Sequence, residues 1–175
     1  MFARFLEEFP LTESDEILDL GVTSDQTYES SNYFVQRYPF KHRITAVGID
    51  DAKFLEDQYP GVRFSYANAL ALPFSERYYV HSSAVLEHVG SFENQAKMVA
   101  ECLRVARKGV CLTTPNRWFP IEFHTRLPVV HWLPKASFRR VLASLNQREL
   151  AQEENLNLMT EKELRRIASA PGYFL

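Results

Sequence analysis

Three polar side chains follow apolar runs of the sequence, at the points where strands of a parallel sheet would end. Asp19 and Gly21 close the first run, Asp50 closes the second, and Asn68 follows the third. Ligands of open α/β sheets collect outside the carboxyl ends of the strands, and a carboxylate there can accept hydrogen bonds from both hydroxyls of a ribose. The spacing therefore predicts a nucleoside site, with Asp50 as the ribose acceptor and Asp51 as the alternative. The other interpretation is that Asp19 and Asp50 are turn residues at strand ends.

Strand and helix signals alternate along the chain and predict the sheet that would hold these residues. Apolar runs favour strands at residues 17–20, 44–49, 62–66, 79–83 and 110–113, with helical stretches between them. The clearest helix is expected at 92–105, with Ser91 as its cap and Lys108-Gly109 as its end. Parallel strands joined by helices predict an α/β fold with a doubly wound, mostly parallel sheet.

Four motifs, in their order, resemble the class I S-adenosylmethionine-dependent methyltransferases of the small-molecule type. They are Ile17-Leu18-Asp19-Leu20-Gly21, Asp50, Asn68-Ala69-Leu70-Ala71-Leu72-Pro73-Phe74 and Val85-Leu86-Glu87-His88-Val89. The resemblance extends from about Glu16 to about Pro115 and implies a Rossmann-like fold, S-adenosylmethionine as cofactor and methyl transfer to oxygen, nitrogen or carbon of a small molecule. The cofactor-binding residues that it implies are Asp19, Gly21, Thr23, Asp50, Asn68, Ala69 and Ser83.

Two of these motifs depart from the family pattern. Where the family continues its first motif as Gly-x-Gly-x-Gly, this chain has Val22-Thr23-Ser24-Asp25, so only the first glycine is present. The hydroxyls of Thr23 and Ser24 can donate hydrogen bonds in compensation, but their side chains take up room beside the methionine part of the cofactor. The aspartate of the third motif is Asn68 here, and its amide oxygen can still accept from the adenine amino group.

Glu87 and His88 follow the fourth predicted strand, where relatives place groups near the transferring methyl. We expect the His88 imidazole to take a proton from a substrate hydroxyl, with Glu87 orienting it. The other interpretation is a polar boundary at the start of a helix. Methyl transfer needs little more than alignment, because the sulfonium is already an activated electrophile.

The segment of about 114–137, named here the lid segment, holds four prolines and both tryptophans. Prolines exclude a regular element, and the aromatic side chains are predicted to be buried. We expect this segment to cover the substrate, and the alternative is a layer that only hides the sheet edge. The predicted substrate contacts are Asn116, Arg117, Glu122 and His124. No metal site is predicted, because His124 and His131 do not form a metal motif.

Composition places the chain among folded globular proteins. Its 175 residues are 46% hydrophobic and 24% charged, which predicts a single methyltransferase-like domain with its core at about 16–115. A formal charge of -2 argues against a nucleic-acid partner. Cys102 and Cys111 indicate reduced thiols and a cytoplasmic protein. No apolar run is long enough for membrane insertion, and the N-terminus is too acidic for a signal peptide.

Towards the end of the sequence, Thr160-Glu161-Lys162-Glu163 has the pattern of a capping box and predicts a helical remainder. In the family, a closing hairpin of two strands would follow. If the chain is complete, the fold lacks this C-terminal strand hairpin and exposes a sheet edge, which a homo-oligomer could cover.

Two other classes of function remain open. A nicotinamide-dependent oxidoreductase shares the sheet and the acid after the second strand, but it needs Gly-x-Gly-x-x-Gly after the first strand, which Val22-Thr23-Ser24-Asp25 does not supply. A non-catalytic, methyltransferase-like binding or interaction module would tolerate both the altered glycine loop and the missing hairpin.

Overall fold

The computed structural model describes residues 2–76 and 78–169. These residues divide into two compact units, which are described separately. Unit 1 contains residues up to 83 together with 100–112, and unit 2 contains 84–99 together with 113–169. The single domain expected from the sequence stays a prediction.

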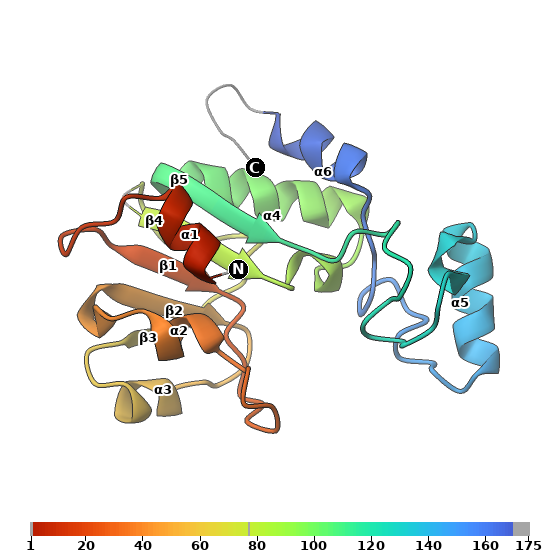
Figure 1. Cartoon of the computed structure of the whole chain (residues 1–175), viewed down its shortest axis with the longest axis horizontal. Helices are drawn as coiled ribbons and strands as arrows, with labels where there is room; N and C mark the ends of the chain where they lie inside the picture. Colours follow the sequence, from red (N-terminus) through yellow and green to blue (C-terminus); the bar gives the residue numbers. More distant parts are fainter. Residues whose placement is uncertain (1, 77, 170–175) are drawn as a thin grey trace. The chain divides into compact units, whose positions relative to one another are not determined.

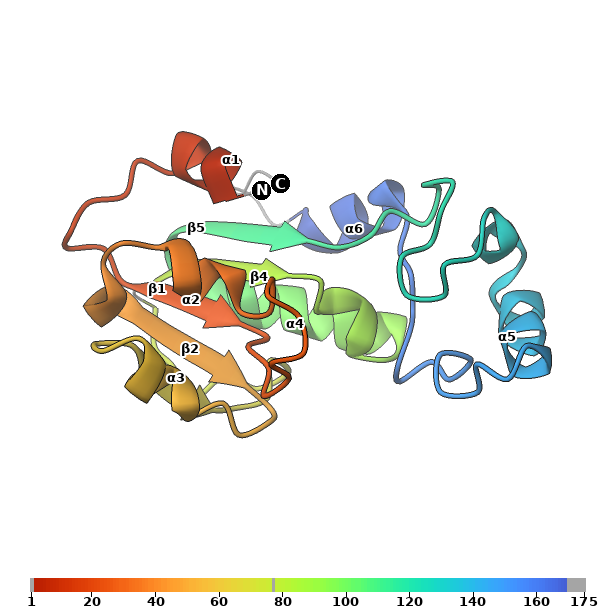
Figure 2. The ribbon, with the colours of Figure 1, turned by 60° about the horizontal axis from the view of Figure 1, so that its bottom comes forward.

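Unit 1 is built on a five-stranded sheet. Its strands are β1 (Ile17–Leu20), β2 (Ile44–Gly48), β3 (Arg63–Tyr66), β4 (Tyr78–Ser83) and β5 (Ala106–Thr113), in the order β3-β2-β1-β4-β5. The pairs β1·β2, β1·β4 and β2·β3 are parallel, and Figure 2 draws β1, β2, β4 and β5 pointing in one direction. The parallel α/β sheet predicted from the sequence is confirmed. A homo-oligomer through the β5 edge stays a prediction.

The strands β1 and β2 form because their sequences are mostly apolar, as buried parallel strands require, with Asp19 and Thr45 as their polar residues. Every residue of β1 and β2 is buried. The helices of unit 1 lie along this sheet (Figure 1) and are α1 (Phe2–Glu8), α2 (Tyr33–Arg37) and α3 (Phe54–Gln58), with a 3-10 turn, η1 (Lys41–Arg43). Phe5 of α1 packs edge-on against Phe34 of α2 at 5.1 Å between ring centroids. This contact anchors the N-terminal helix in the core of unit 1.

The helix predicted at 92–105 is confirmed as α4 (Phe92–Val105), and the hydroxyl of Ser91 accepts a hydrogen bond from the Asn94 amide at 3.2 Å. The predicted helix end at Lys108-Gly109 is wrong, because β5 already begins at Ala106. Gly109 lies buried within the strand, where an added Cβ would clash with Cε1 of Phe9. The glycine is therefore needed for close packing and not for a helix cap.

Unit 2 contains the turns η2 (Leu86–His88) and η3 (Val130–Trp132) and the helices α5 (Lys135–Ser144) and α6 (Glu161–Ala168). Phe138 and Leu142 of α5 pack with Leu156 and Leu158 in a small core. The predicted capping box is confirmed: the Thr160 hydroxyl accepts from the Glu163 amide, and the Glu163 carboxylate accepts from the Thr160 amide at 2.7 Å.

The burial predicted for the aromatic side chains of the lid segment is wrong. Trp118 is 55% exposed and Phe123 is 65% exposed. The segment is instead held by polar contacts to its own backbone. His131, which is only 1% exposed, lies with Nε2 2.7 Å from the Phe119 carbonyl. Arg117 donates to the carbonyls of His131 and Leu133.

The remaining points concern a membrane-spanning helix and the closing hairpin of the family. Among the residues that the structure describes, no helix has both the length and the apolar character needed to cross a membrane. The end of the sequence, where the closing hairpin of the family would begin, lies outside the described residues.

Candidate functional site

The chain turns sharply after β1 at Gly21. Its backbone φ is 90°, in the left-handed region that favours glycine. The amides of Gly21 and Val22 both donate to the carbonyl of Val47, at 2.8 and 3.1 Å. These bonds hold the start of the loop against the carboxyl end of β2, so that the ends of β1 and β2 lie together as the sequence predicts.

A side chain braces the loop that lacks the later family glycines. The amide oxygen of Asn32 accepts from the backbone N–H of Thr23 at 2.9 Å, and its amide nitrogen donates to the Thr23 carbonyl at 3.0 Å. Asn32 itself has a φ of 56°, a left-handed conformation that asparagine tolerates better than most residues. The Thr23 hydroxyl accepts from the Asp25 amide at 3.0 Å, so it is already engaged within the loop. Asn32 was not among the residues predicted from the sequence.

The predicted ribose acceptor lies beyond the end of β2. Asp50 is exposed, and its carboxylate has no hydrogen bond to another described residue. Asp51 differs, since its Oδ1 accepts from the Lys53 amide at 3.0 Å, next to the start of α3. Both oxygens of the Asp50 carboxylate are therefore available for a ligand, whereas one oxygen of Asp51 already accepts from the backbone.

Asn68 and Ala69 follow β3. The amide of Ala67, directly after β3, donates to the carbonyl of Gly48 at the end of β2, at 3.1 Å. The side-chain oxygen of Asn68 accepts from the Leu70 amide at 2.9 Å. An amide oxygen has two lone pairs, so one remains for a ligand. In the order β3-β2-β1, Asn68, Asp50 and Gly21 thus follow the carboxyl ends of three adjacent strands.

The side chain of Asp19 is buried and bonded within the sheet, so it is not open to a ligand. It is 5% exposed, and its Oδ1 lies 2.6 Å from Nδ1 of His81 on the neighbouring strand β4. Nε2 of His81 lies 3.1 Å from the Tyr33 hydroxyl, which also contacts Ser83. Burial raises the pKa of Tyr33, although the hydrogen bond with Ser83 opposes this shift. The network joins β1, β4 and α2, and a histidine inside an apolar strand was the sequence signal for it that the analysis missed.

A polar hollow of about 310 Å³ lies in unit 1. It is lined by residues of the segment 25–36, among them Asn32, and by α3 with Tyr59. None of Gly21, Asp50 and Asn68 lines it. The hollow therefore borders the loop after β1 without marking the predicted nucleoside site itself, for which the strand ends remain the stronger guide.

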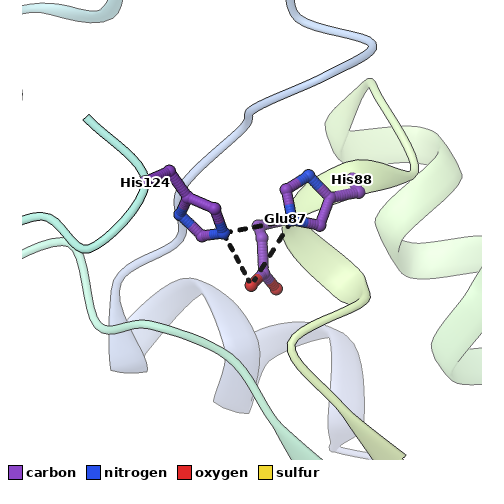
Figure 3. A group of neighbouring side chains, drawn as sticks. All are labelled: Glu87, His88 and His124. Carbon is purple, nitrogen blue, oxygen red and sulfur yellow. Dashed lines mark hydrogen bonds and ion pairs between the residues drawn. The ribbon is translucent and has the colours of Figure 1, made fainter. Parts of the chain in front are cut away.

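Unit 2 brings His124 to the adjacent residues Glu87 and His88, and Figure 3 shows the three side chains facing one another. Nε2 of His88 lies 3.1 Å from Nε2 of His124. Oε1 of Glu87 lies 3.9 Å from the first of these nitrogens and 3.8 Å from the second. The sequence predicted a Glu87–His88 pair and assigned His124 to the substrate, but it did not predict that the three would meet.

Contacts around the cluster hold each member in place. The Asn157 amide donates to the Glu87 carbonyl at 2.7 Å, and the Thr114 hydroxyl donates to Glu87 Oε2 at 2.9 Å. Nδ1 of His88 lies 2.5 Å from the Asn155 carbonyl. Nδ1 of His124 lies 2.7 Å from Glu122 Oε1.

Glu122 and His124 shift one another's protonation. Burial raises the pKa of the Glu122 carboxyl, but hydrogen bonds from His124 and Thr125 outweigh it and lower the pKa to about 2. The hydrogen bond to Glu122 raises the pKa of His124, and burial opposes this. Glu122 is 3% exposed and thus acts inside unit 2 as a support for His124.

The two remaining predicted substrate residues lie at the start of the lid segment. Asn116 is exposed, and its side-chain oxygen accepts from the Trp118 amide at 3.0 Å. The Arg117 guanidinium is bound to backbone carbonyls of η3 and the residue after it. A substrate role for these residues stays a prediction.

Comparison with solved structures identifies the fold. A SAM-dependent methyltransferase from Methanosarcina mazei superposes with a TM-score of 0.56 at 20% identity, over 93% of this chain and 81% of its own. The YcgJ protein from Bacillus subtilis has a TM-score of 0.61 at 14% identity, over 95% of this chain and 64% of its own.

Geranyl diphosphate C-methyltransferase from Streptomyces coelicolor A3(2), solved with S-adenosyl-L-homocysteine, geranyl diphosphate and Mg²⁺, has a TM-score of 0.57 at 15% identity. The similarity covers 94% of this chain, which spans only 55% of that enzyme's length. No family model matches the sequence, and no curated protein does either. On the strand order and these superpositions, the chain has the Rossmann-like fold of the class I S-adenosylmethionine-dependent methyltransferases.

Proposed function

We propose that this protein is an S-adenosylmethionine-dependent methyltransferase that acts on a small-molecule acceptor. The observation that carries the proposal is the placement of Gly21, Asp50 and Asn68 after three adjacent parallel strands. Ligands of this class of sheet bind outside the carboxyl ends of the strands. The proposal is supported by the fact that the structural neighbours include a SAM-dependent methyltransferase and a C-methyltransferase solved with S-adenosyl-L-homocysteine.

Each of the three strand ends would contact a different part of the cofactor. The backbone at Gly21 approaches the ligand without a Cβ. The Asp50 carboxylate accepts from the ribose hydroxyls, and the free lone pair of the Asn68 amide oxygen accepts from the adenine amino group. Thr23 and Ala69 lie close to Gly21 and Asn68 in the sequence, Ser83 ends β4, and these three residues complete the proposed set. Asp19 contributes through its bond to His81, which holds β1 and β4 together.

The reaction transfers a methyl group from sulfur to an oxygen, nitrogen or carbon of the acceptor. A lone pair or carbanion of the acceptor forms the bond to the methyl carbon, the carbon–sulfur bond breaks, and its electron pair stays on sulfur. The proton lost by the acceptor passes to a base, for which we propose His88 with Glu87 beside it. The 38% exposure of the His88 side chain leaves it accessible to an acceptor.

The exposed aromatic side chains of the lid segment support an acceptor with an apolar or ring-like part. Trp118 and Phe119 are 55% and 51% exposed, and such side chains bind apolar ligands through large, rigid surfaces. Asn116, Arg117, Glu122 and His124 are the proposed polar contacts or supports.

The proposal is tested by calorimetric titration of the full chain with S-adenosylmethionine, S-adenosylhomocysteine and NAD. We expect binding of the first two and none of NAD. Asp50→Ala should weaken cofactor binding by about 1.5–3 kcal/mol, the range for a hydrogen bond to a charged group, or about 10- to 150-fold in Kd.

Asp51→Ala is the matched control, since it removes the neighbouring carboxylate, whose one hydrogen bond among the described residues is from the Lys53 amide. It should leave the affinity within about twofold. Equal losses in both variants would refute the assignment of Asp50 as the ribose acceptor. Binding of NAD alone would favour an oxidoreductase, and binding of none of the three would favour an interaction module.

A further inference from the structure

The cluster of Glu87, His88 and His124 has the composition of a metal site. Two imidazole nitrogens and one carboxylate oxygen converge from η2 and from the lid segment, with separations of 3.1, 3.8 and 3.9 Å. Two histidines and one carboxylate are a common ligand set for zinc and for other first-row transition-metal ions. The glutamate and the second histidine are far apart in sequence, which is why no sequence motif indicated the site.

The far nitrogen of each imidazole is bound to a group that accepts a hydrogen bond. Nδ1 of His88 faces the Asn155 carbonyl at 2.5 Å, and a carbonyl can only accept, so this nitrogen carries a proton. Nδ1 of His124 faces the Glu122 carboxylate at 2.7 Å, which already accepts from the His124 and Thr125 amides. Outer contacts of this kind, carboxylate or carbonyl to the distal nitrogen, orient metal-binding histidines in proteins.

With their Nδ1 atoms protonated, two neutral imidazoles present lone pairs on Nε2, and these two atoms are only 3.1 Å apart. Two lone pairs at that distance repel one another. A positive species near both nitrogens removes the repulsion, and this species is either a proton carried by one ring or a metal ion.

Glu87 supplies the independent observation that points to a ligand. Its residue is 0% exposed, and Oε1 finds no hydrogen-bond donor among the residues that the structure describes. A buried carboxylate oxygen without a partner is costly, and the atom faces both Nε2 nitrogens in Figure 3. The other oxygen, Oε2, is held by the Thr114 hydroxyl, which orients the carboxylate.

We propose that Glu87 Oε1, His88 Nε2 and His124 Nε2 bind one divalent transition-metal ion with the ligand preferences of Zn²⁺. In a tetrahedral zinc site with bonds of about 2.0–2.2 Å, neighbouring ligand atoms stand about 3.3 Å apart. The observed separations lie on both sides of this value, so small side-chain movements complete the geometry. Hard cations such as Mg²⁺ prefer all-oxygen sites and fit two imidazoles poorly.

Three protein ligands leave a fourth position for water or for a hydroxyl group of an acceptor. An ion bound here would occupy the lone pair of His88, so His88 could serve as the base only without the ion. With the ion bound, the metal would stabilise the acceptor oxygen and the proton would pass to solvent water. This consequence rests on the proposed function, whereas binding of the ion does not. The exposure of His88 provides a path of entry from solvent.

The test is calorimetric titration of the full chain, stripped with a chelator and dialysed, with Zn²⁺ and separately with Mg²⁺. We expect one Zn²⁺ per chain and no saturable binding of Mg²⁺. His88→Ala and Glu87→Gln should each weaken zinc binding by tenfold or more, because loss of even an outer contact costs about 10- to 100-fold. Circular dichroism checks that both variants fold. His88→Ala is expected to disturb folding less than Glu87→Gln, because His88 is exposed and Glu87 is buried.

His42→Ala, at an exposed histidine in unit 1, is the matched control and should leave the affinity unchanged. Co²⁺ gives a second readout, a visible d–d absorption that His88→Ala should abolish. Absence of saturable Zn²⁺ binding would assign the cluster to a shared proton and overturn the proposal. Zinc binding that survives in folded His88→Ala and Glu87→Gln, that falls equally in His42→Ala, or that is weaker than Mg²⁺ binding would overturn it as well.

Discussion

Replacement of Asn32 by glycine tests whether a side-chain brace stands in for the missing glycines of the loop after β1. The change removes both hydrogen bonds to the Thr23 backbone, at 2.9 and 3.0 Å, while glycine keeps the left-handed conformation without strain. The two bonds, at about 0.5–1.5 kcal/mol each, and the extra chain entropy of glycine, about 0.5–1 kcal/mol, should together lower the free energy of unfolding of Asn32→Gly by about 1.5–4 kcal/mol.

Asn32→Ala separates the backbone effect from the hydrogen bonds. Alanine loses the same two bonds and also pays about 1–2 kcal/mol in the left-handed region, against about 0.5–1 kcal/mol of extra chain entropy that glycine loses on folding. We therefore expect Asn32→Ala to be about 0.5–1 kcal/mol less stable than Asn32→Gly. Urea unfolding followed by circular dichroism measures both differences.

Asn146 provides a matched control in unit 2. Its φ is 63°, it is exposed, and its side chain has no hydrogen bond to another described residue. Asn146→Gly should change the free energy of unfolding by no more than the entropy of one glycine, about 0.5–1 kcal/mol. If Asn32→Gly is no less stable than Asn146→Gly, or if Asn32→Ala matches Asn32→Gly, the brace does not hold the loop.

The same variants connect the loop to ligand binding. A loop that is ordered for only a fraction of the time lowers the apparent affinity by that fraction, and each 1.4 kcal/mol of ordering free energy is a factor of ten. We expect the affinity for S-adenosylmethionine to fall in the order wild type, Asn32→Gly, Asn32→Ala. Unchanged affinity in destabilised variants would show that the loop does not contact the cofactor.

Three further predictions concern single contacts. Gly109→Ala should cost about 1–3 kcal/mol of unfolding free energy because its Cβ meets Phe9, and less in a Phe9→Leu background; strictly additive losses in urea unfolding would contradict this. Burial raises the pKa of Asp15, but hydrogen bonds from Lys108 and Thr12 outweigh burial and hold the pKa below 3.8. The ionised Asp15 carboxylate therefore stabilises the folded state above pH 3.8, and this contribution is lost as the pH falls through the lowered pKa. Asp15→Asn should therefore make the free energy of unfolding fall less steeply as the pH is lowered below 3.8, and an unchanged pH dependence would exclude this role. Thr160→Ala should destabilise α6 by about 1 kcal/mol, seen as faster amide exchange in its first turn, whereas Glu161→Gln, which breaks only an exposed ion pair, should cost about 0.5 kcal/mol or less.

Local features of the fold were predictable because they depend on neighbours in the sequence. The strand at 17–20 and the helix at 92–105 were predicted with their observed bounds, since apolar runs and helical periodicity are sequence patterns. The capping box at Thr160 was predicted because its partners lie three residues apart. The start of β5 was not predicted, because Gly109 indicated a helix end by sequence. Its role within β5 depends on packing against the ring of Phe9, a contact between residues that are distant in sequence.

The predicted site residues divide in the same way. Gly21, Asp50 and Asn68 could be placed in advance, since parallel strands bring their carboxyl ends to one edge of a sheet. The bond between Asp19 and His81 could not, because it depends on the register of β1 against β4, in which these two residues are partners. The exposed rings of the lid segment also differ from expectation, because hydrophobic composition does not say which side chains find a core.

The sequence by itself determined the order of strands and helices along the chain, the α/β class and which polar residues follow the strands, because each of these depends on composition and on spacing within one element. Only the tertiary structure decided what those residues meet. His124 reaches His88 across 36 residues of chain, and Glu87 lies beside both. Glu122 holds His124 in place, and the Asn155 carbonyl holds His88. Such convergence depends on how loops close over a core, and the free energy of closing a loop varies too weakly with its length for sequence spacing to reveal it.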